Sequence, residues 1–284
     1  MVSNSVILSF YTVLIAIITI PIMIAVLMKI KTKVKFSPFL LGLLVYFTFA
    51  VVCVAFVNII FVNKGRPTAA FINSNVIVYS LYFAVVTGLL EELGIFVAFK
   101  KIIGSQDDKR TALMYSLGHA GLEAFLIAGP AMFVYITCAT AINELGIEGF
   151  KTQWADTQTL DLDEIVEVLT EMGITDVLLM GVERVMYFIM HIFLSIIVFY
   201  AVKREAKVYF WIAVILRGLC TVPGSLKNFG TYKGNGAETA IMLAYTVIII
   251  AVAGYIGIKL YRSYDTEQVL MPRDLLRKKA SSLL

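Results

Sequence analysis

Three carboxylates and two histidines lie in stretches of the chain that are otherwise apolar. Glu91 and Glu92 are adjacent near the end of one such stretch, and His119 and Glu123 lie four residues apart near the start of the next. The second histidine, His191, lies in a later apolar stretch, and the sequence contains no other histidine. An ionisable side chain at membrane depth is energetically costly, so these groups are candidates for a functional site.

These residue types suit two kinds of hydrolytic chemistry. Two imidazoles and a carboxylate, here those of His119, His191 and Glu123, can hold Zn²⁺ and leave a position for water. A further carboxylate, from Glu91 or Glu92, can then take the proton of that water. Without a metal, a carboxylate could act as the general base while a histidine stabilises the developing oxyanion. The residues alone leave both chemistries open.

The two adjacent glutamates cannot both face one point, because consecutive residues of an α-helix point about 100° apart. We therefore expect one of Glu91 and Glu92 to work in the site and the other to be a structural partner of a cation or a backbone group. Two polar residues are supporting candidates. Arg217 is a candidate counter-ion for the glutamates, and Ser195, one helical turn after His191, could donate a hydrogen bond to an oxyanion.

The elements that carry these residues are long and apolar. Of the 284 residues, 60% are hydrophobic and 15% are charged, a composition outside the range of soluble globular domains. A helix needs about 20 apolar residues to cross a hydrocarbon core of about 30 Å. Seven stretches meet that length, at about residues 6–28, 39–62, 75–99, 112–142, 177–202, 208–226 and 239–260. The sequence therefore predicts an all-α, polytopic membrane bundle of seven transmembrane helices.

Basic residues alternate between crowded and sparse connections along the chain. Four regions are crowded: the first, third and fifth connections between spans and the C-terminal tail. By the positive-inside rule, the N-terminus lies outside and the C-terminus in the cytoplasm. At 1.5 Å per helical residue from the basic ends, Glu91 and His119 lie at one depth in the cytoplasmic half. Glu123, His191 and Arg217 fall close to that depth.

Two regions complete the predicted domain organisation. Residues 1–260 form the membrane domain, which includes an acidic extracytoplasmic connection at 143–176. Within this connection, Asp161 is a candidate helix cap that precedes apolar residues at helical spacing. Residues 261–284 form a basic cytoplasmic tail, which we expect to lie against anionic headgroups.

Several classes of site and partner are not expected. Cys53, Cys138 and Cys220 lie singly in apolar stretches, without the spacing of a disulfide framework or a sulfur metal site. No basic patch interleaved with aromatic residues indicates a nucleic acid partner. The expected partners are the lipid bilayer and a peptide or membrane-protein substrate.

The polar motifs also resemble a known family. The pair Glu91-Glu92, the stretch of residues 118–123, which reads Gly-His-Ala-Gly-Leu-Glu, and the later His191 with Ser195 are similar to the YhfC family of intramembrane metalloproteases. This family is related to the superfamily of CAAX-processing and bacteriocin-processing proteases. The resemblance covers about residues 5–260.

The resemblance implies roles for individual residues. Glu91 would activate water, and His119 and His191 would be ligands or oxyanion stabilisers in a site that opens toward the cytoplasm. Relatives often carry a basic residue one turn after the glutamate pair, and Arg217 or Arg184 would replace that charge here.

Gly118 and Gly121 flank His119 and leave no side chain there. Either another backbone approaches closely at these positions or a substrate strand lies across the helix.

Together, these features predict an intramembrane endopeptidase of a prokaryotic plasma membrane. Glu91 would activate a water held with His119 and His191, Glu123 would orient or complete the site, and Zn²⁺ is the candidate cofactor. Two alternatives stay open. One is a non-catalytic membrane protein, such as an immunity, chaperone or signalling partner, built on a protease-like fold. The other is a proton-coupled transporter that uses the buried carboxylates as a relay.

Overall fold

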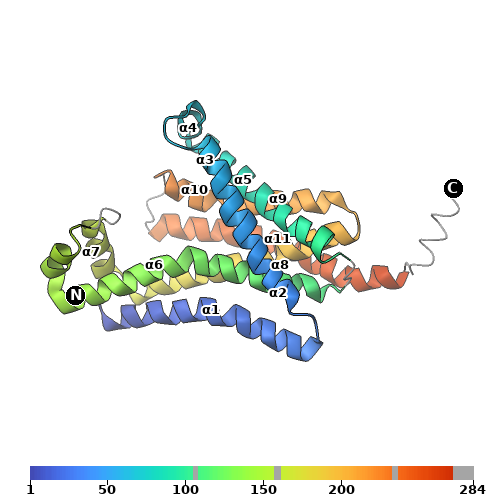
Figure 1. Cartoon of the computed structure of the whole chain (residues 1–284), viewed down its shortest axis with the longest axis horizontal. Helices are drawn as coiled ribbons and strands as arrows, with labels where there is room; N and C mark the ends of the chain where they lie inside the picture. The colour runs from blue at the N-terminus through green and yellow to red at the C-terminus, as the bar shows by residue number, and fades with distance from the viewer. Residues whose placement is uncertain (105–107, 157–160, 232–235, 271–284) are drawn as a thin grey trace.

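The computed structural model of the chain is an all-helical bundle (Figure 1). It describes residues 1–104, 108–156, 161–231 and 236–270. Seven helical stretches of this described chain are long and apolar enough to cross a membrane, namely Asn4–Thr32, Ser37–Phe61, Val76–Ile102, Arg110–Gln153, Ile174–Lys203, Lys207–Asn228 and Glu238–Asp265. Each coincides with one of the seven predicted spans, so their number and helical nature are confirmed.

Four of the spans are single helices and three contain more than one helical segment. The single helices are α1 (Asn4–Thr32), α6 (Arg110–Gln153), α8 (Ile174–Lys203) and α11 (Gly236–Leu270). The second span combines α2 (Ser37–Val45), the π-helix η1 (Tyr46–Cys53) and α3 (Val54–Phe61). The third combines α5 (Val76–Val97) with the π-helix η2 (Ala98–Ile102), and the sixth combines α9 (Lys207–Cys220) with α10 (Val222–Asn228). Helices α4 (Pro67–Ile72) and α7 (Leu162–Glu171) lie between spans.

Helix α6 continues beyond the thickness of a bilayer. Residues 110–145, before the helix breaks at Gly146, correspond to about 54 Å at 1.5 Å per residue. The backbone leaves helical geometry at Gly146, where φ is 71°, a left-handed value that favours glycine. The end of α6 therefore turns aside toward α7.

Helix α7 is the predicted helix behind Asp161. The Asp161 carboxylate accepts hydrogen bonds from the backbone N–H groups of Asp163 and Glu164, which caps the first turn. The apolar face of α7 is buried against the bundle through Ile165, Val166 and Leu169.

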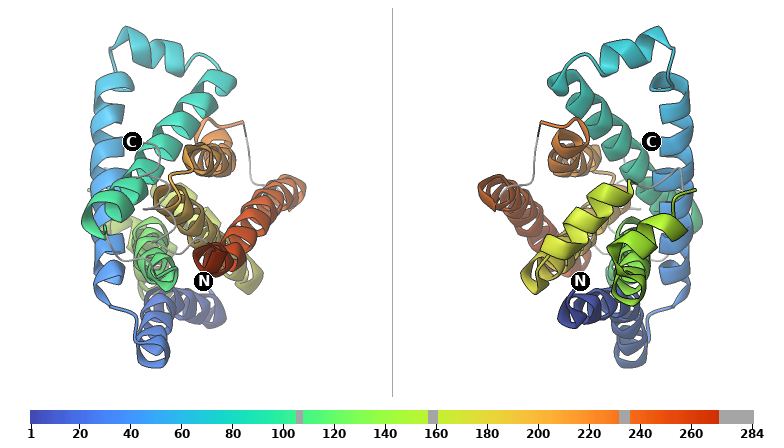
Figure 2. Two further views of the ribbon diagram at one scale, coloured as in Figure 1. Left: turned by 90° about the vertical axis from the view of Figure 1, so that its right-hand side faces the viewer. Right: turned by 90° about the vertical axis from the view of Figure 1, so that its left-hand side faces the viewer.

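Helix α8 is the most buried span. Of its most apolar stretch, 56% is buried inside the protein, compared with 17–39% for the other six spans. It packs against α1, α6, α9 and α11. Figures 1 and 2 show α2, η1, α3 and α5 crossing this group of helices obliquely. Side chains on the inner face of α8 are therefore surrounded by protein rather than lipid.

Glycines allow the backbones of the second and fourth spans to touch. A Cβ atom on Gly118 of α6 would lie 1.9 Å from the carbonyl oxygen of Phe39 on α2. A Cβ atom on Gly42 of α2 would lie 2.2 Å from the carbonyl oxygen of Tyr115 on α6. Of the two interpretations of Gly118, the close backbone approach is correct, because α2 occupies the place that a substrate strand would need.

The third and sixth spans make a similar contact. A Cβ atom on Gly88 of α5 would lie 2.6 Å from the carbonyl oxygen of Val214 on α9, and one on Gly218 would lie 2.8 Å from that of Ala84. Small residues at such interfaces let membrane helices approach closely. The contact holds α9 beside the glutamate-bearing part of α5.

We predict that Gly118→Ala destabilises the protein, because the added methyl group would push α2 away from α6. The loss of unfolding free energy should be about 1–3 kcal/mol, the usual range for overpacking. Thermal unfolding in detergent, followed by circular dichroism, measures it. The matched control is Gly224→Ala, where an added Cβ meets no atom within 4 Å. Equal unfolding temperatures for the two variants would contradict the proposed contact.

Candidate functional site

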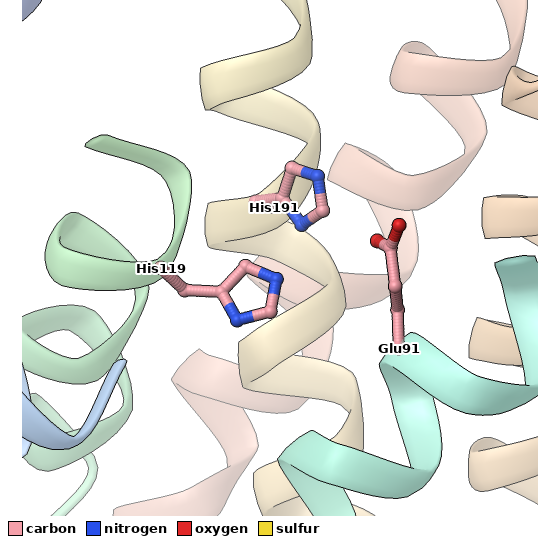
Figure 3. Close-up of side chains that lie close together, drawn as sticks. All are labelled: Glu91, His119 and His191. Carbon is pink, nitrogen blue, oxygen red and sulfur yellow. The ribbon is translucent and has the colours of Figure 1, made fainter. Parts of the chain in front are cut away.

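Glu91, His119 and His191 come together from three spans (Figure 3). Glu91 lies on α5, His119 on α6 and His191 on α8. One potential ligand atom from each residue lies within 4.8 Å of the other two. The two imidazole centroids are 4.9 Å apart. None of the three residues is more than 3% exposed, so the cluster is enclosed by protein.

Arg217 on α9 binds two carboxylates of the site. Its Nε and Nη2 atoms donate hydrogen bonds to Glu91 Oε2 and Oε1, at 2.5 and 3.0 Å. Nη2 also donates to Glu123 Oε1, at 3.0 Å. Bidentate arginine–carboxylate pairs are among the stronger hydrogen-bonded contacts in proteins. Arg217 thereby connects α5 with α6 and holds the Glu91 carboxylate in one orientation.

Glu123 connects α6 to α8. Its Oε2 atom lies in close contact with Nε2 of His191. Glu123 is 2% exposed and His191 is fully buried. The two residues that the sequence placed at similar depth in different spans therefore touch.

Two tyrosines contact His119. The Tyr115 hydroxyl, one turn earlier on α6, lies 3.4 Å from His119 Nδ1. The Tyr46 ring meets the imidazole edge-on, with centroids 5.1 Å apart and planes at 81°. The other nitrogen, His119 Nε2, is buried and has no hydrogen-bond partner in the described part of the chain. Metal-binding histidines commonly have one nitrogen engaged by a neighbour in this way, which leaves the other to bind the ion.

The donor atoms of this cluster fit a metal ion. His119 Nε2 and His191 Nδ1 are buried without a hydrogen bond to any described residue. Such unpaired polar atoms cost about 1–3 kcal/mol each, a cost that a bound cation would remove. Two imidazole nitrogens and a carboxylate oxygen are a donor set that zinc prefers. The spacing of at most 4.8 Å lets one ion lie among them after small side-chain movements.

The buried charges also favour a divalent cation. Glu91 and Glu123 are each at most 3% exposed, and within the described bundle Arg217 is the cation bonded to both. Buried carboxylates without a matching cation are strongly unfavourable. When both carboxylates are ionised, their two negative charges exceed the single positive charge of Arg217, which favours a further cation beside the histidines.

Glu92 is not part of the cluster. It is completely buried, and neither carboxylate oxygen has a hydrogen-bond partner in the regions that the structure describes. One glutamate of the pair faces the histidines and the other points elsewhere, as the helical geometry predicts. The cation or backbone partner expected for the second glutamate is not seen among the described residues.

The remaining sequence candidates occupy distinct positions. Ser195 is buried one turn from His191, and its hydroxyl has no hydrogen bond to the described chain. It therefore differs from the many serines in membrane helices that bond to their own backbone. Arg184 pairs with the adjacent Glu183 at 2.9 Å. Of the two arginines considered as counter-ions, Arg217 is the one that contacts the glutamates.

Sequence reasoning missed both tyrosines. Tyr115 had a usable signal, because it precedes His119 by four residues and so lies on the same helical face. Tyr46 had none, because it lies on a different span and nothing in its sequence context distinguishes it from other aromatic residues.

Taken together, the fold and the cluster define a polytopic helical membrane protein with a buried group that could hold a metal ion. A model of the YhfC intramembrane metalloprotease family matches residues 16–242, and the chain belongs to that family. This confirms the family resemblance of the polar motifs. The chain is also 27% identical over 246 residues to a Bacillus subtilis (strain 168) protein described as "Uncharacterized membrane protein YhfC", which covers 87% of this chain and 93% of that protein. No solved structure matches the chain.

We predict that Arg217→Met lowers stability by about 3–5 kcal/mol, because it leaves Glu91 and Glu123 buried without their cation. Thermal unfolding of the purified protein in detergent measures the loss. The matched control is Arg184→Met, which should cost less because its partner Glu183 has a side chain that is 45% exposed. Adding Glu91→Gln to Arg217→Met should restore part of the stability. If Arg217→Met unfolds at the same temperature as Arg184→Met, the bridge does not stabilise the bundle.

Proposed function

We propose that this protein is an intramembrane endopeptidase that hydrolyses peptide bonds within or beside the cytoplasmic half of the bilayer. One observation carries the proposal: Glu91, His119 and His191 meet within 4.8 Å inside the seven-span bundle of a YhfC family member. These are the residue types that metal-assisted hydrolysis requires. The substrate is a peptide or a membrane protein.

His119 and His191 would hold a zinc ion, each through the nitrogen that its neighbours leave free. Tyr115 engages Nδ1 of His119, and Glu123 contacts Nε2 of His191. When bound, zinc supplies a readily deprotonated water and polarises the scissile carbonyl group. Glu123 acts mainly by orienting His191.

Glu91 is the general base in this proposal. Its carboxylate accepts the proton of the attacking water and later returns it to the amine of the departing peptide. Arg217 fixes the orientation of that carboxylate and offsets its charge. The enclosed position keeps bulk water away, which strengthens these electrostatic interactions.

The experiment that tests this function measures cleavage and bound zinc together. Purified protein is loaded with Zn²⁺ and assayed against a fluorogenic library of membrane peptides. Glu91→Gln should reduce the cleavage rate at least about 100-fold, because it removes the base. His119→Ala should remove both cleavage and bound zinc, because it removes a ligand. The matched control Glu183→Gln, outside the cluster, should retain both.

The outcomes separate the proposal from its alternatives. Cleavage that survives both Glu91→Gln and His119→Ala unchanged would contradict the proposed site. A wild-type protein that binds zinc but cleaves no peptide of the library would favour the non-catalytic interpretation. Substrate uptake into proteoliposomes that depends on a pH gradient would favour a transporter.

We further propose that the N-terminus lies outside the cell and the C-terminus in the cytoplasm of a prokaryotic plasma membrane. Three contacts support this by bringing basic connections to the same end of the bundle. Lys109 forms an ion pair with Asp265 at 2.6 Å, Arg204 donates to the Tyr264 carbonyl oxygen at 2.8 Å, and Lys203 donates to the Gly104 carbonyl oxygen at 2.5 Å. Basic residues that gather at one end favour the cytoplasmic side.

We predict that Asp156→Cys reacts with a membrane-impermeant maleimide in intact cells and that Lys35→Cys reacts only after the membrane is permeabilised. Both positions are exposed and lie in connections that the topology assigns to opposite sides. The parent for both variants has Cys53, Cys138 and Cys220 replaced by alanine, so it controls for background labelling. The reverse labelling pattern would overturn the proposed orientation.

A further inference from the structure

Tyr46 is a buried tyrosine at the edge of the cluster, and neither the sequence motifs nor the family match draws attention to it. It is the first residue of η1 and is 5% exposed. Its ring meets the His119 imidazole edge-on, with centroids 5.1 Å apart. The residue therefore brings a fifth backbone segment, η1, to a site built from α5, α6, α8 and α9.

The Tyr46 ring lies against the imidazole of His119, one of the three residues whose ligand atoms meet within 4.8 Å. Its hydroxyl is the polar group that Tyr46 brings to this part of the bundle. No hydrogen bond of this hydroxyl is seen within the described ranges of the chain. The other tyrosine on the same imidazole differs, because the Tyr115 hydroxyl is engaged at His119 Nδ1. Tyr46 thus carries an O–H donor on a ring that contacts a candidate ligand of the site.

Two helix contacts hold Tyr46 in place. One turn before it, Gly42 packs directly on the α6 backbone, where a Cβ atom would lie 2.2 Å from the Tyr115 carbonyl oxygen. Three residues after it, the Phe49 ring lies against Gly94 of α5, where a Cβ atom would lie 2.7 Å from the ring. Tyr46 is therefore fixed between the helix of the histidine and the helix of the base.

The local backbone supports a functional position as well. η1 runs for eight residues as a π-helix inside a span that is otherwise α-helical. π-Helical turns are rare and occur frequently at functional sites. The wider turn changes the direction in which successive side chains point, and it begins at Tyr46.

We propose that Tyr46 is a catalytic residue of this site, and that its hydroxyl donates a hydrogen bond to the scissile carbonyl oxygen as negative charge develops there. This role rests on the proposed hydrolytic function. Donors that are already in place for a developing oxyanion are typically worth about 100- to 1000-fold in rate.

The step balances without a further reactant. Water oxygen bonds to the carbonyl carbon, Glu91 takes the water proton, and the π electron pair of the carbonyl moves onto its oxygen. Tyr46 stabilises that oxygen by a hydrogen bond and keeps its own proton. The electron pair then re-forms the C=O bond, the C–N bond breaks, and the amine leaves with the proton from Glu91. The products are a carboxylic acid and an amine.

The test uses Co²⁺-loaded full-length protein in detergent and methylphosphonate as a small oxyanion mimic. The Co²⁺ absorption spectrum reports metal binding and anion binding separately. Tyr46→Phe should leave Co²⁺ affinity and the metal spectrum unchanged and should weaken methylphosphonate at least about tenfold, because a hydrogen bond to a charged group is lost. With any peptide that the wild type cleaves, the same variant should lower kcat about 100-fold or more and leave KM unchanged.

Two further variants make the result specific. Tyr135→Phe is the matched control, because Tyr135 contacts Phe10 in another part of the bundle; it should bind both Co²⁺ and methylphosphonate like the wild type. Tyr115→Phe should weaken Co²⁺ itself, because Tyr115 positions His119.

Three results would overturn the role of Tyr46. These are unchanged methylphosphonate affinity in Tyr46→Phe, a parallel loss of Co²⁺ and methylphosphonate affinity in that variant, and a wild type that binds Co²⁺ but not methylphosphonate. A wild type that fails to bind Co²⁺ would instead contradict the proposed metal-dependent function.

Discussion

The bridge that Arg217 makes from Glu91 to Glu123 is the interaction on which the site depends. A guanidinium and two carboxylates are stable inside a membrane bundle only if they are held at contact distance and shielded from lipid. The packing of α5 on α9 through Gly88 and Gly218 satisfies this requirement, because larger residues there would separate the charges. The small residues at these two positions therefore keep the charged residues at contact distance.

The polar cluster also contributes to the specific association of these helices. In lipid, apolar surfaces gain little by meeting one another, so association depends on close packing and on polar contacts between helices. Here each contact crosses a different helix pair: Arg217 with Glu91 links α9 to α5, Arg217 with Glu123 links α9 to α6, and Glu123 with His191 links α6 to α8. Losing one of them would loosen the site and the bundle together.

Hydropathy and charge were sufficient for the parts of the structure that depend on depth. They predicted the seven spans. Counting residues from the basic ends also placed Glu91, His119 and His191 at similar depths, and the three side chains form one cluster in the structure. They could not predict rotation about each helix axis, because in a membrane both the lipid-facing and the protein-facing sides are apolar. For that reason the approach of α2 to α6 became visible only in three dimensions.

Each of the two histidines has one ring nitrogen in contact with a neighbouring polar side chain. His119 has Nδ1 beside the Tyr115 hydroxyl, and His191 has Nε2 against the Glu123 carboxylate. Neighbours of this kind fix the ring orientation and the tautomer, so the opposite nitrogen of each ring is the one that can bind an ion. Both oxygens of Glu91 accept hydrogen bonds from Arg217, which fixes the orientation of this carboxylate beside the two rings. The same charged contacts that stabilise the bundle thus also fix the positions of Glu91 and His191 in the cluster.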